Sequence, residues 1–231
     1  PYGDIKAVKN ALKKTTGGIL IEPILGEGGI VVADKKFIQE LRKIANDNGL
    51  LLMFDEVQCG MGRTGKFFAY EWFGVKPDII SSAKGIGNGF PLGACLANNR
   101  AAKAMKPGTH GSTYGSNPLA MAVGNAVVDV ILSKGFLSKV NKVAKYFDKE
   151  LHGVMQSFPN LVEEIRGLGL MKGIKLKQDN NPVVQKLRAA RLLTVPAADN
   201  VIRLLPPLII EEKHVDEAIR ILRKVFREID K

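Results

Sequence analysis

The chain has 231 residues, of which 45% are hydrophobic and 25% are charged. This length and balance are typical of a globular protein with one or two domains, and they exclude a disordered chain or a coiled coil. No apolar stretch reaches the roughly 18 residues that a transmembrane helix needs, so we expect no membrane span. Residues 1–4 carry neither a basic cluster nor an apolar stretch, so we expect no signal peptide.

The formal net charge of +11 raises the question of a nucleic-acid partner. The basic excess is spread evenly over both halves of the chain, and only 6% of the residues are aromatic. A nucleic-acid-binding protein concentrates its charge on one face or interleaves it with stacking rings, so we expect no such partner. Two cysteines, Cys59 and Cys95, form neither a disulfide framework nor a zinc motif, which favours the cytoplasm.

The first half of the chain alternates segments typical of strands and helices. Asp4 and Asp34 are the expected N-caps of helices that end near residues 12 and 48. The expected strands cover residues 18–24, 50–54, 78–82 and 93–97. Because residues 50–54 are apolar throughout, we expect that strand to be covered on both faces. The alternation predicts a three-layer α/β fold around a mostly parallel sheet.

Helical periodicity dominates residues 117–132 and 136–158, and we place a domain boundary near residue 135. The segments beyond it read as four strands and two helices. The strands cover residues 162–166, 170–176, 192–195 and 201–205, and the helices cover residues 182–190 and 211–229. The sequence therefore predicts a larger domain over residues 1–134, and a linker helix with a small α/β domain over residues 135–231.

Two carboxylates, Asp55 and Glu56, follow directly on the apolar strand 50–54. Ligands of open α/β sheets bind at the carboxyl ends of strands, where a desolvated carboxylate needs a cation or a donor. Adjacent strand residues point to opposite sides, so the two carboxylates need not share one site. Alone, they also fit a helix cap or a surface turn. The glycine-rich segment 60–65 matches no phosphate-loop pattern.

Lys84 follows the expected strand 78–82 and precedes three glycines within five residues. Glycines let a planar group approach the backbone closely. A lysine is most often a solvated surface residue, but a partly buried one loses its proton and attacks an aldehyde. Asp55 and Lys84 together would supply an anion for a cationic ring and an amine for an aldehyde.

The polar segment 110–118 opens the helix expected from Asn117. The hydroxyl groups of Ser112 and Thr113 near a helix start suit a phosphate or a carboxylate. Ordinary turn chemistry explains them equally well.

Several motifs run through the chain in a fixed order. They are Glu22-Pro23-Ile24 with Gly26-Glu27-Gly28-Gly29, the run from Phe54 to Gly65, Lys84-Gly85-Ile86-Gly87, Gly89-Phe90-Pro91, His110-Gly111-Ser112-Thr113-Tyr114-Gly115, Arg166-Gly167-Leu168-Gly169-Leu170, and Ile202-Arg203-Leu204-Leu205-Pro206-Pro207-Leu208. In order and spacing they resemble the class-III pyridoxal-phosphate-dependent aminotransferases, most closely those that act on acetylornithine. The resemblance implies the fold-type I transferase fold, with the C-terminal part of the cofactor-binding large domain before residue 135.

The resemblance also implies a cofactor, pyridoxal 5′-phosphate, and residues that hold it. Lys84 would bind the cofactor covalently and later shuttle a proton. Asp55 would keep the ring nitrogen protonated, so that the ring withdraws electrons. Glu56, Val57 and Gln58 would complete this group, with Val57 on the ring face and Gln58 near the phenolic oxygen.

Substrate-binding residues follow from the same resemblance. Ser112 would approach the substrate, and Thr113 would contact the cofactor phosphate of a partner subunit, which implies a homodimer. Arg203 would clamp a substrate carboxylate through both guanidinium nitrogens. Glu27 would pair with Arg203, so that one site alternates between an amine donor and 2-oxoglutarate. No metal is implied.

The implied reaction moves the terminal amine of N2-acetylornithine to 2-oxoglutarate, giving glutamate, as a step of arginine biosynthesis. Aminotransferases of ornithine, 4-aminobutyrate and succinyl-diaminopimelate are close alternatives. Family members are longer than this chain, so we expect it to lack their N-terminal part. That part carries the main cofactor-phosphate loop, an aromatic residue stacked on the ring and a second substrate-binding arginine. An inactive folded fragment is therefore the alternative outside the enzymes.

Overall fold

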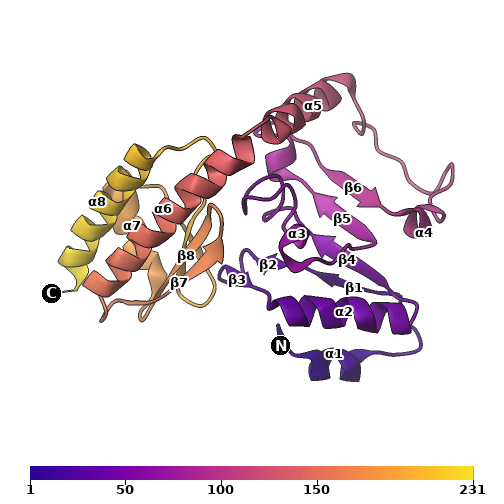
Figure 1. Ribbon diagram of the computed structural model, residues 1–231, viewed down its shortest axis with the longest axis horizontal. Helices are drawn as coiled ribbons and strands as arrows, with labels where there is room; N and C mark the ends of the chain where they lie inside the picture. The colour runs from indigo at the N-terminus through magenta and orange to yellow at the C-terminus, as the bar shows by residue number, and fades with distance from the viewer. Residues whose placement is uncertain (231) are drawn as a thin grey trace. The chain divides into compact units, whose positions relative to one another are not determined.

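The computed structural model describes residues 1–230, which divide into two compact units (Figure 1). Unit 1 comprises Pro1–Pro23, Ala33–Gly62 and Lys66–Lys134. Unit 2 comprises Ile24–Val32, Arg63–Gly65 and the chain from Gly135 onward. Two short segments that precede residue 134 thus belong to the C-terminal unit, and no pattern in the sequence indicated this.

Unit 1 is built on a four-stranded sheet with the strand order β1-β4-β5-β6. The strands are β1 (Gly18–Ile21), β4 (Leu51–Asp55), β5 (Ile79–Ser82) and β6 (Ala94–Ala97). β1 and β5 run parallel to β4, whereas β6 runs antiparallel to β5. The predicted α/β class with a mostly parallel sheet is confirmed.

Helices flank this sheet, and α2 (Lys35–Asp47) packs against β4 and β1. The Asp34 carboxylate caps α2 by accepting hydrogen bonds from the amides of Lys36 and Phe37, which no residue within the helix can satisfy. The other helices of unit 1 are α1 (Ile5–Ala11), α3 (Tyr70–Phe73), the 3₁₀ turn η1 (Lys84–Ile86), α4 (Asn99–Ala102) and α5 (Pro118–Leu132).

Two expectations for the strands of unit 1 were wrong. Burial alternates along β4, where Leu52 and Phe54 have no exposed surface, but Met53 on the opposite face is only half-buried. Among the described residues, β4 is therefore not fully covered on both faces. The strand expected over residues 18–24 ends at Ile21, because Pro23 has no N–H to donate to a sheet.

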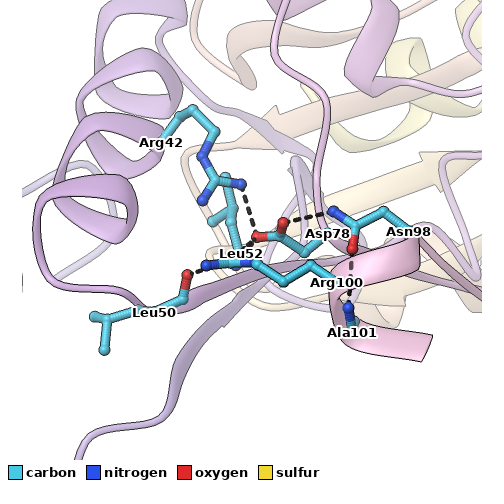
Figure 2. A network of polar contacts seen from close by, with 7 residues as sticks. All are labelled: Arg42, Leu50, Leu52, Asp78, Asn98, Arg100 and Ala101. Carbon is cyan, nitrogen blue, oxygen red and sulfur yellow. Dashed lines mark hydrogen bonds and ion pairs between the residues drawn. The ribbon is translucent and has the colours of Figure 1, made fainter. Parts of the chain in front are cut away.

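Asp78 ties together three elements of unit 1 at the amino end of β5 (Figure 2). Its carboxylate accepts hydrogen bonds from Arg42 on α2 (2.8 Å), the Leu52 amide on β4 (2.8 Å), Asn98 before α4 (2.7 Å) and Arg100 on α4 (3.0 Å). Burial alone would raise the pKa of Asp78, but these donors outweigh it and lower the pKa to about 2. The network fixes the end of the sheet opposite to the carboxyl ends of β4 and β5.

Unit 2 contains a four-stranded antiparallel sheet with the order β7-β8-β10-β9 and a two-stranded ribbon, β2-β3. The strands are β2 (Ile24–Leu25), β3 (Val31–Val32), β7 (Val162–Leu168), β8 (Met171–Leu176), β9 (Val195–Ala197) and β10 (Val201–Leu204). The helices are α6 (Phe136–Ser157), α7 (Asn180–Ala189) and α8 (Glu212–Ile229). The strand expected over residues 192–195 instead begins at Val195.

Apolar faces of these helices and strands form the core of unit 2. Leu151 on α6, Ile174 on β8 and Phe226 on α8 are fully buried in it, and the rings of Phe158 and Phe226 meet edge to face at 5.6 Å. No single helix within residues 1–230 is long and apolar enough to cross a membrane. One pair joined at a bend, α5 with α6, meets the length and composition criteria only when taken together.

Candidate active site

Asp55 and Lys84 lie at the same edge of the sheet of unit 1. Asp55 ends β4 and pairs in register with Ser81 on the parallel strand β5, and the Glu56 amide donates to Ser81 O at 2.9 Å. Lys84 follows Ser81 by three residues and lies two residues after the end of β5 at Ser82. The carboxyl ends of two neighbouring parallel strands therefore present a carboxylate and an amine to one edge, where α/β sheets bind their ligands.

The Asp55 carboxylate is anchored through one of its two oxygens. Oδ1 accepts a hydrogen bond from the Val57 amide at 3.0 Å, whereas Oδ2 accepts none from residues 1–230. The side chain is half-buried, and the bond to Val57 fixes its direction at the turn after β4. One carboxylate oxygen is thus available to a ligand.

Lys84 has a backbone conformation that side chains rarely adopt. Its φ is +49°, in the left-handed region, and its carbonyl accepts hydrogen bonds from the amides of Gly87 and Asn88. Such strain of about 1–3 kcal/mol persists where the surrounding fold enforces it, often at functional sites. The side chain is exposed and forms no ion pair within the part of the chain that the structure describes. The exposed amine is thus accessible to a ligand.

Glycine is required in the turn after Lys84. A Cβ at Gly87 would lie 2.0 Å from Phe90 O, and a Cβ at Gly85 would lie 3.0 Å from Met61 Cβ. Any side chain at Gly87 would therefore displace the backbone that sets the direction of Lys84.

Glu56 is the one residue of the expected cofactor group that the structure turns inward. It has no exposed surface, and its carboxylate accepts hydrogen bonds from the amides of Ala69 (2.5 Å) and Tyr70 (2.8 Å) at the start of α3. Burial raises the pKa of Glu56 to about 7, and the nearby charge of Glu71 raises it further. The two backbone hydrogen bonds lower the pKa, but they do not outweigh burial. In this position the Glu56 carboxylate links the segment after Asp55 to the start of α3.

Ser112 and Thr113 lie in an exposed segment that leads into α5. The Ser112 hydroxyl accepts a hydrogen bond from the Gly115 amide at 3.0 Å, and Asn117 caps α5 by accepting from the Ala120 amide at 2.9 Å. No hydrogen bond joins Ser112 or Thr113 to the β4 and β5 turns in the described chain. Val57 and Gln58 are half-buried directly after Asp55.

Arg203 and Glu27 form an ion pair in unit 2. Arg203 on β10 is 6% exposed, and its two terminal nitrogens face the two oxygens of Glu27, at 2.5 Å (Nη1–Oε1) and 2.9 Å (Nη2–Oε2). The Glu27 side chain is 74% exposed. A buried guanidinium thus holds an exposed carboxylate in a two-pronged ion pair, the geometry that also binds a substrate carboxylate.

Two arginines that carry contacts in unit 2 were given no role from sequence. Arg63 donates to Pro206 O (2.5 Å) and Leu170 O (3.3 Å), and burial lowers its pKa to about 10. Arg166 contacts the turn that carries Glu27. Both arginines lie in glycine-containing motifs, and these motifs were the sequence feature that could have drawn attention to them. Only the fold shows what each arginine contacts.

Comparisons with known proteins agree on one family. The family model described as "Aminotransferase class-III" matches residues 2–226. The acetylornithine aminotransferase of Agrobacterium fabrum is 56% identical over 219 residues, which cover 95% of this chain and 55% of that protein. The acetylornithine aminotransferase of Methanocaldococcus jannaschii is 45% identical over 231 residues, which cover 100% of this chain and 58% of that protein.

Solved structures give the same picture. Ornithine δ-aminotransferase of Plasmodium falciparum matches with a TM-score of 0.92 at 32% identity, covering 100% of this chain and 60% of that one. Acetylornithine aminotransferase of Elizabethkingia anophelis matches with a TM-score of 0.89 at 34% identity, covering 99% and 59%. The chain therefore spans little more than half the length of the relatives it matches.

Proposed function

This chain belongs to the class-III aminotransferases, and from that membership we propose that its protein transfers the terminal amine of N2-acetylornithine to 2-oxoglutarate. The observation that carries the proposal is the placement of Asp55 and Lys84 at one edge of the sheet. The relatives named for acetylornithine favour this donor over ornithine, 4-aminobutyrate and succinyl-diaminopimelate. The proposed place of the reaction is arginine biosynthesis in the cytoplasm.

The residues present fit pyridoxal 5′-phosphate as the cofactor. An aldehyde needs a primary amine, and Lys84 offers one with no ion-pair partner within residues 1–230. A protonated ring nitrogen needs an anion, and Asp55 has one carboxylate oxygen without a hydrogen bond from the described chain. When bound, this cofactor supplies an aldehyde that accepts amines and a ring that withdraws electrons.

The side chains at this edge of the sheet would each have a role in the reaction. The Lys84 amine would hold the cofactor and would also serve as the base that takes the proton from the substrate carbon that bears the amine. The Asp55 carboxylate keeps the ring nitrogen protonated. Val57 would pack on the ring face, and Gln58 would lie near the phenolic oxygen. Glu56 acts indirectly on the cofactor site, because its hydrogen bonds with the start of α3 hold the turn that follows Asp55.

The ion pair of Arg203 and Glu27 would let one site bind the amine donor and 2-oxoglutarate in turn. A dicarboxylic oxo acid binds the Arg203 guanidinium only when Glu27 moves away from it. An amine donor with a differently placed carboxylate leaves the Glu27–Arg203 ion pair intact. Because Arg203 is buried and Glu27 is exposed, Glu27 is the partner that can move. Ser112 would approach the substrate.

We further propose that the protein is a homodimer. Thr113 lies in a segment whose side chains are exposed from residue 103 to residue 116, so its hydroxyl is accessible to a second subunit. It would contact the cofactor phosphate bound by that subunit.

The test is a transamination assay that compares the four donors with 2-oxoglutarate as acceptor. We expect glutamate to form fastest from N2-acetylornithine, and no glutamate to form with Lys84→Ala. Faster turnover of another donor would overturn the substrate assignment. A purified protein that stays colourless with pyridoxal phosphate would favour the reading of an inert folded module.

A further inference from the structure

The turn that carries Glu27 is connected to the rest of unit 2 at several points. This turn, residues 26–30, links β2 to β3. The Ala198 amide, in the hairpin between β9 and β10, donates to Glu27 O at 2.9 Å. The next strand of that hairpin, β10, carries Arg203, so this hydrogen bond joins the backbones on both sides of the ion pair.

Arg166 on β7 contacts both sides of the same junction. Its Nη1 donates to Gly29 O in the turn at 3.2 Å, and its Nη2 pairs with Asp199 in the hairpin at 2.8 Å. Its Nε donates to Glu164 at 2.6 Å, which fixes the guanidinium on its own strand. The side chain is only 14% exposed, and the planar guanidinium can make all three contacts at once.

The turn is also held in a strained conformation. Ile30 has φ +53°, which is a true outlier for a β-branched residue, and it has no exposed surface. It packs where Gly167 and Gly173 leave room, since a Cβ at either glycine would lie 3.0 Å from an Ile30 carbon. A strained conformation persists only when its surroundings enforce it, so the position of the turn is specified rather than incidental.

The hairpin side is equally defined. Asp199 and Asn200 both have positive φ, +59° and +55°, as the two central residues of a tight hairpin turn require. Asp199 also pairs with Lys175 at 3.4 Å, and Lys175 pairs with Glu163 at 2.9 Å. Lys175 therefore contacts the hairpin through Asp199 and β7 through Glu163, whereas Arg166 contacts the hairpin and the turn of Glu27.

We propose that Arg166 is a positioning residue that holds the Glu27 turn against the Arg203 hairpin and so sets how readily the Glu27–Arg203 ion pair opens. Its role rests on the proposed function, in which 2-oxoglutarate must displace Glu27 from Arg203. A turn held close keeps the pair closed and hinders the oxo acid, whereas a released turn lets Glu27 leave at a lower cost. Arg166 thereby tunes the choice between amine donor and oxo acid without touching either.

The first arm of the test measures hydrogen–deuterium exchange and does not depend on activity. In Arg166→Met we expect the peptide covering residues 24–32 to exchange about tenfold faster, because a charge-assisted link to the turn is lost. Lys175→Met is the matched control, since it removes one positive charge of similar burial from the same network, and residues 24–32 should then exchange as in the wild type. Equal exchange of residues 24–32 in wild type and Arg166→Met would overturn the proposal.

The second arm measures kcat/KM for each substrate, which in a ping-pong reaction reports its own half-reaction. Arg166→Met should raise kcat/KM for 2-oxoglutarate about three- to tenfold and leave the value for the amine donor unchanged. A parallel loss with both substrates would mean that Arg166 serves stability alone and would refute the tuning role. Arg166→Lys is the second variant should the Met variant fold poorly, because a point charge cannot make all three contacts and should give the same shift in part.

The two proposals fail separately. If the wild-type protein shows no transamination, the proposed function falls, while the exchange experiment still decides whether Arg166 holds the turn.

Discussion

Replacing Asp78 by Asn should destabilise unit 1 by about 3 kcal/mol at neutral pH. The Asp78 side chain is 8% exposed, and it is the common acceptor for Arg42, Arg100, Asn98 and the Leu52 amide. Removing one partner of a buried ion pair costs about 3–5 kcal/mol, because the other charge stays buried without compensation. We take the lower end because Arg42 is 18% exposed and Arg100 is 48% exposed, so water can solvate part of their charge.

The pH dependence of this effect has a defined sign. The pKa of Asp78 is lowered from 3.8 to about 2 in the folded chain, so its contribution to stability is present above the unfolded value and is lost as the pH falls through the folded one. The difference in unfolding free energy between wild type and Asp78→Asn should therefore shrink between about pH 4 and about pH 2.

The assay is urea unfolding followed by the fluorescence of Trp72, which is the only tryptophan and lies in unit 1. Asp129→Asn is the control, because Asp129 is an exposed helical residue with no ion pair in the described chain, and it should change stability by less than about 0.5 kcal/mol. A loss below about 1 kcal/mol for Asp78→Asn, or a loss that is the same at both ends of the pH range, would refute the reasoning.

Three further changes test the site. Asp55→Asn should retain cofactor binding but lose most of kcat, because the ring nitrogen loses its proton; an equal loss in Asp55→Glu would show that geometry matters more than charge. Arg203→Lys should raise KM for 2-oxoglutarate, because a point charge replaces a fork, and unchanged KM values for both substrates would exclude that role. Glu56→Gln should gain stability relative to the wild type as the pH rises from about 5 to about 8, since burial raises the pKa of Glu56 to about 7 and ionisation then costs stability. Urea unfolding at the two pH values checks this, and a constant difference would contradict it.

Much of the fold could be predicted from local patterns. Asp34 and Asn117 mark helix starts because their side chains satisfy amides that the helix leaves unpaired. Apolar runs gave the positions of β4 and β5, and hence of Asp55 and Lys84. These signals are local, so a single sequence is enough to read them.

The features that the sequence did not reveal depend on contacts between distant segments. Ile24–Val32 joins unit 2 through Arg166 and Ala198, which lie more than a hundred residues further along the chain. Glu56 carries the same charge as its neighbour Asp55, yet it turns inward to the amides of Ala69 and Tyr70. Which of the two adjacent carboxylates turns inward is decided by those partners, and no spacing rule predicts them.

The most direct test of the proposed site is borohydride reduction of this polypeptide with pyridoxal phosphate, followed by peptide mapping. Borohydride reduces the imine between an aldehyde and an amine to a stable single bond. The peptide map then identifies the lysine that holds the cofactor. We expect the adduct on Lys84 alone, because Lys84 follows β5 at the same carboxyl edge of the sheet where Asp55 ends β4. Label spread over several lysines, with none favoured, would contradict an organised cofactor site in this chain.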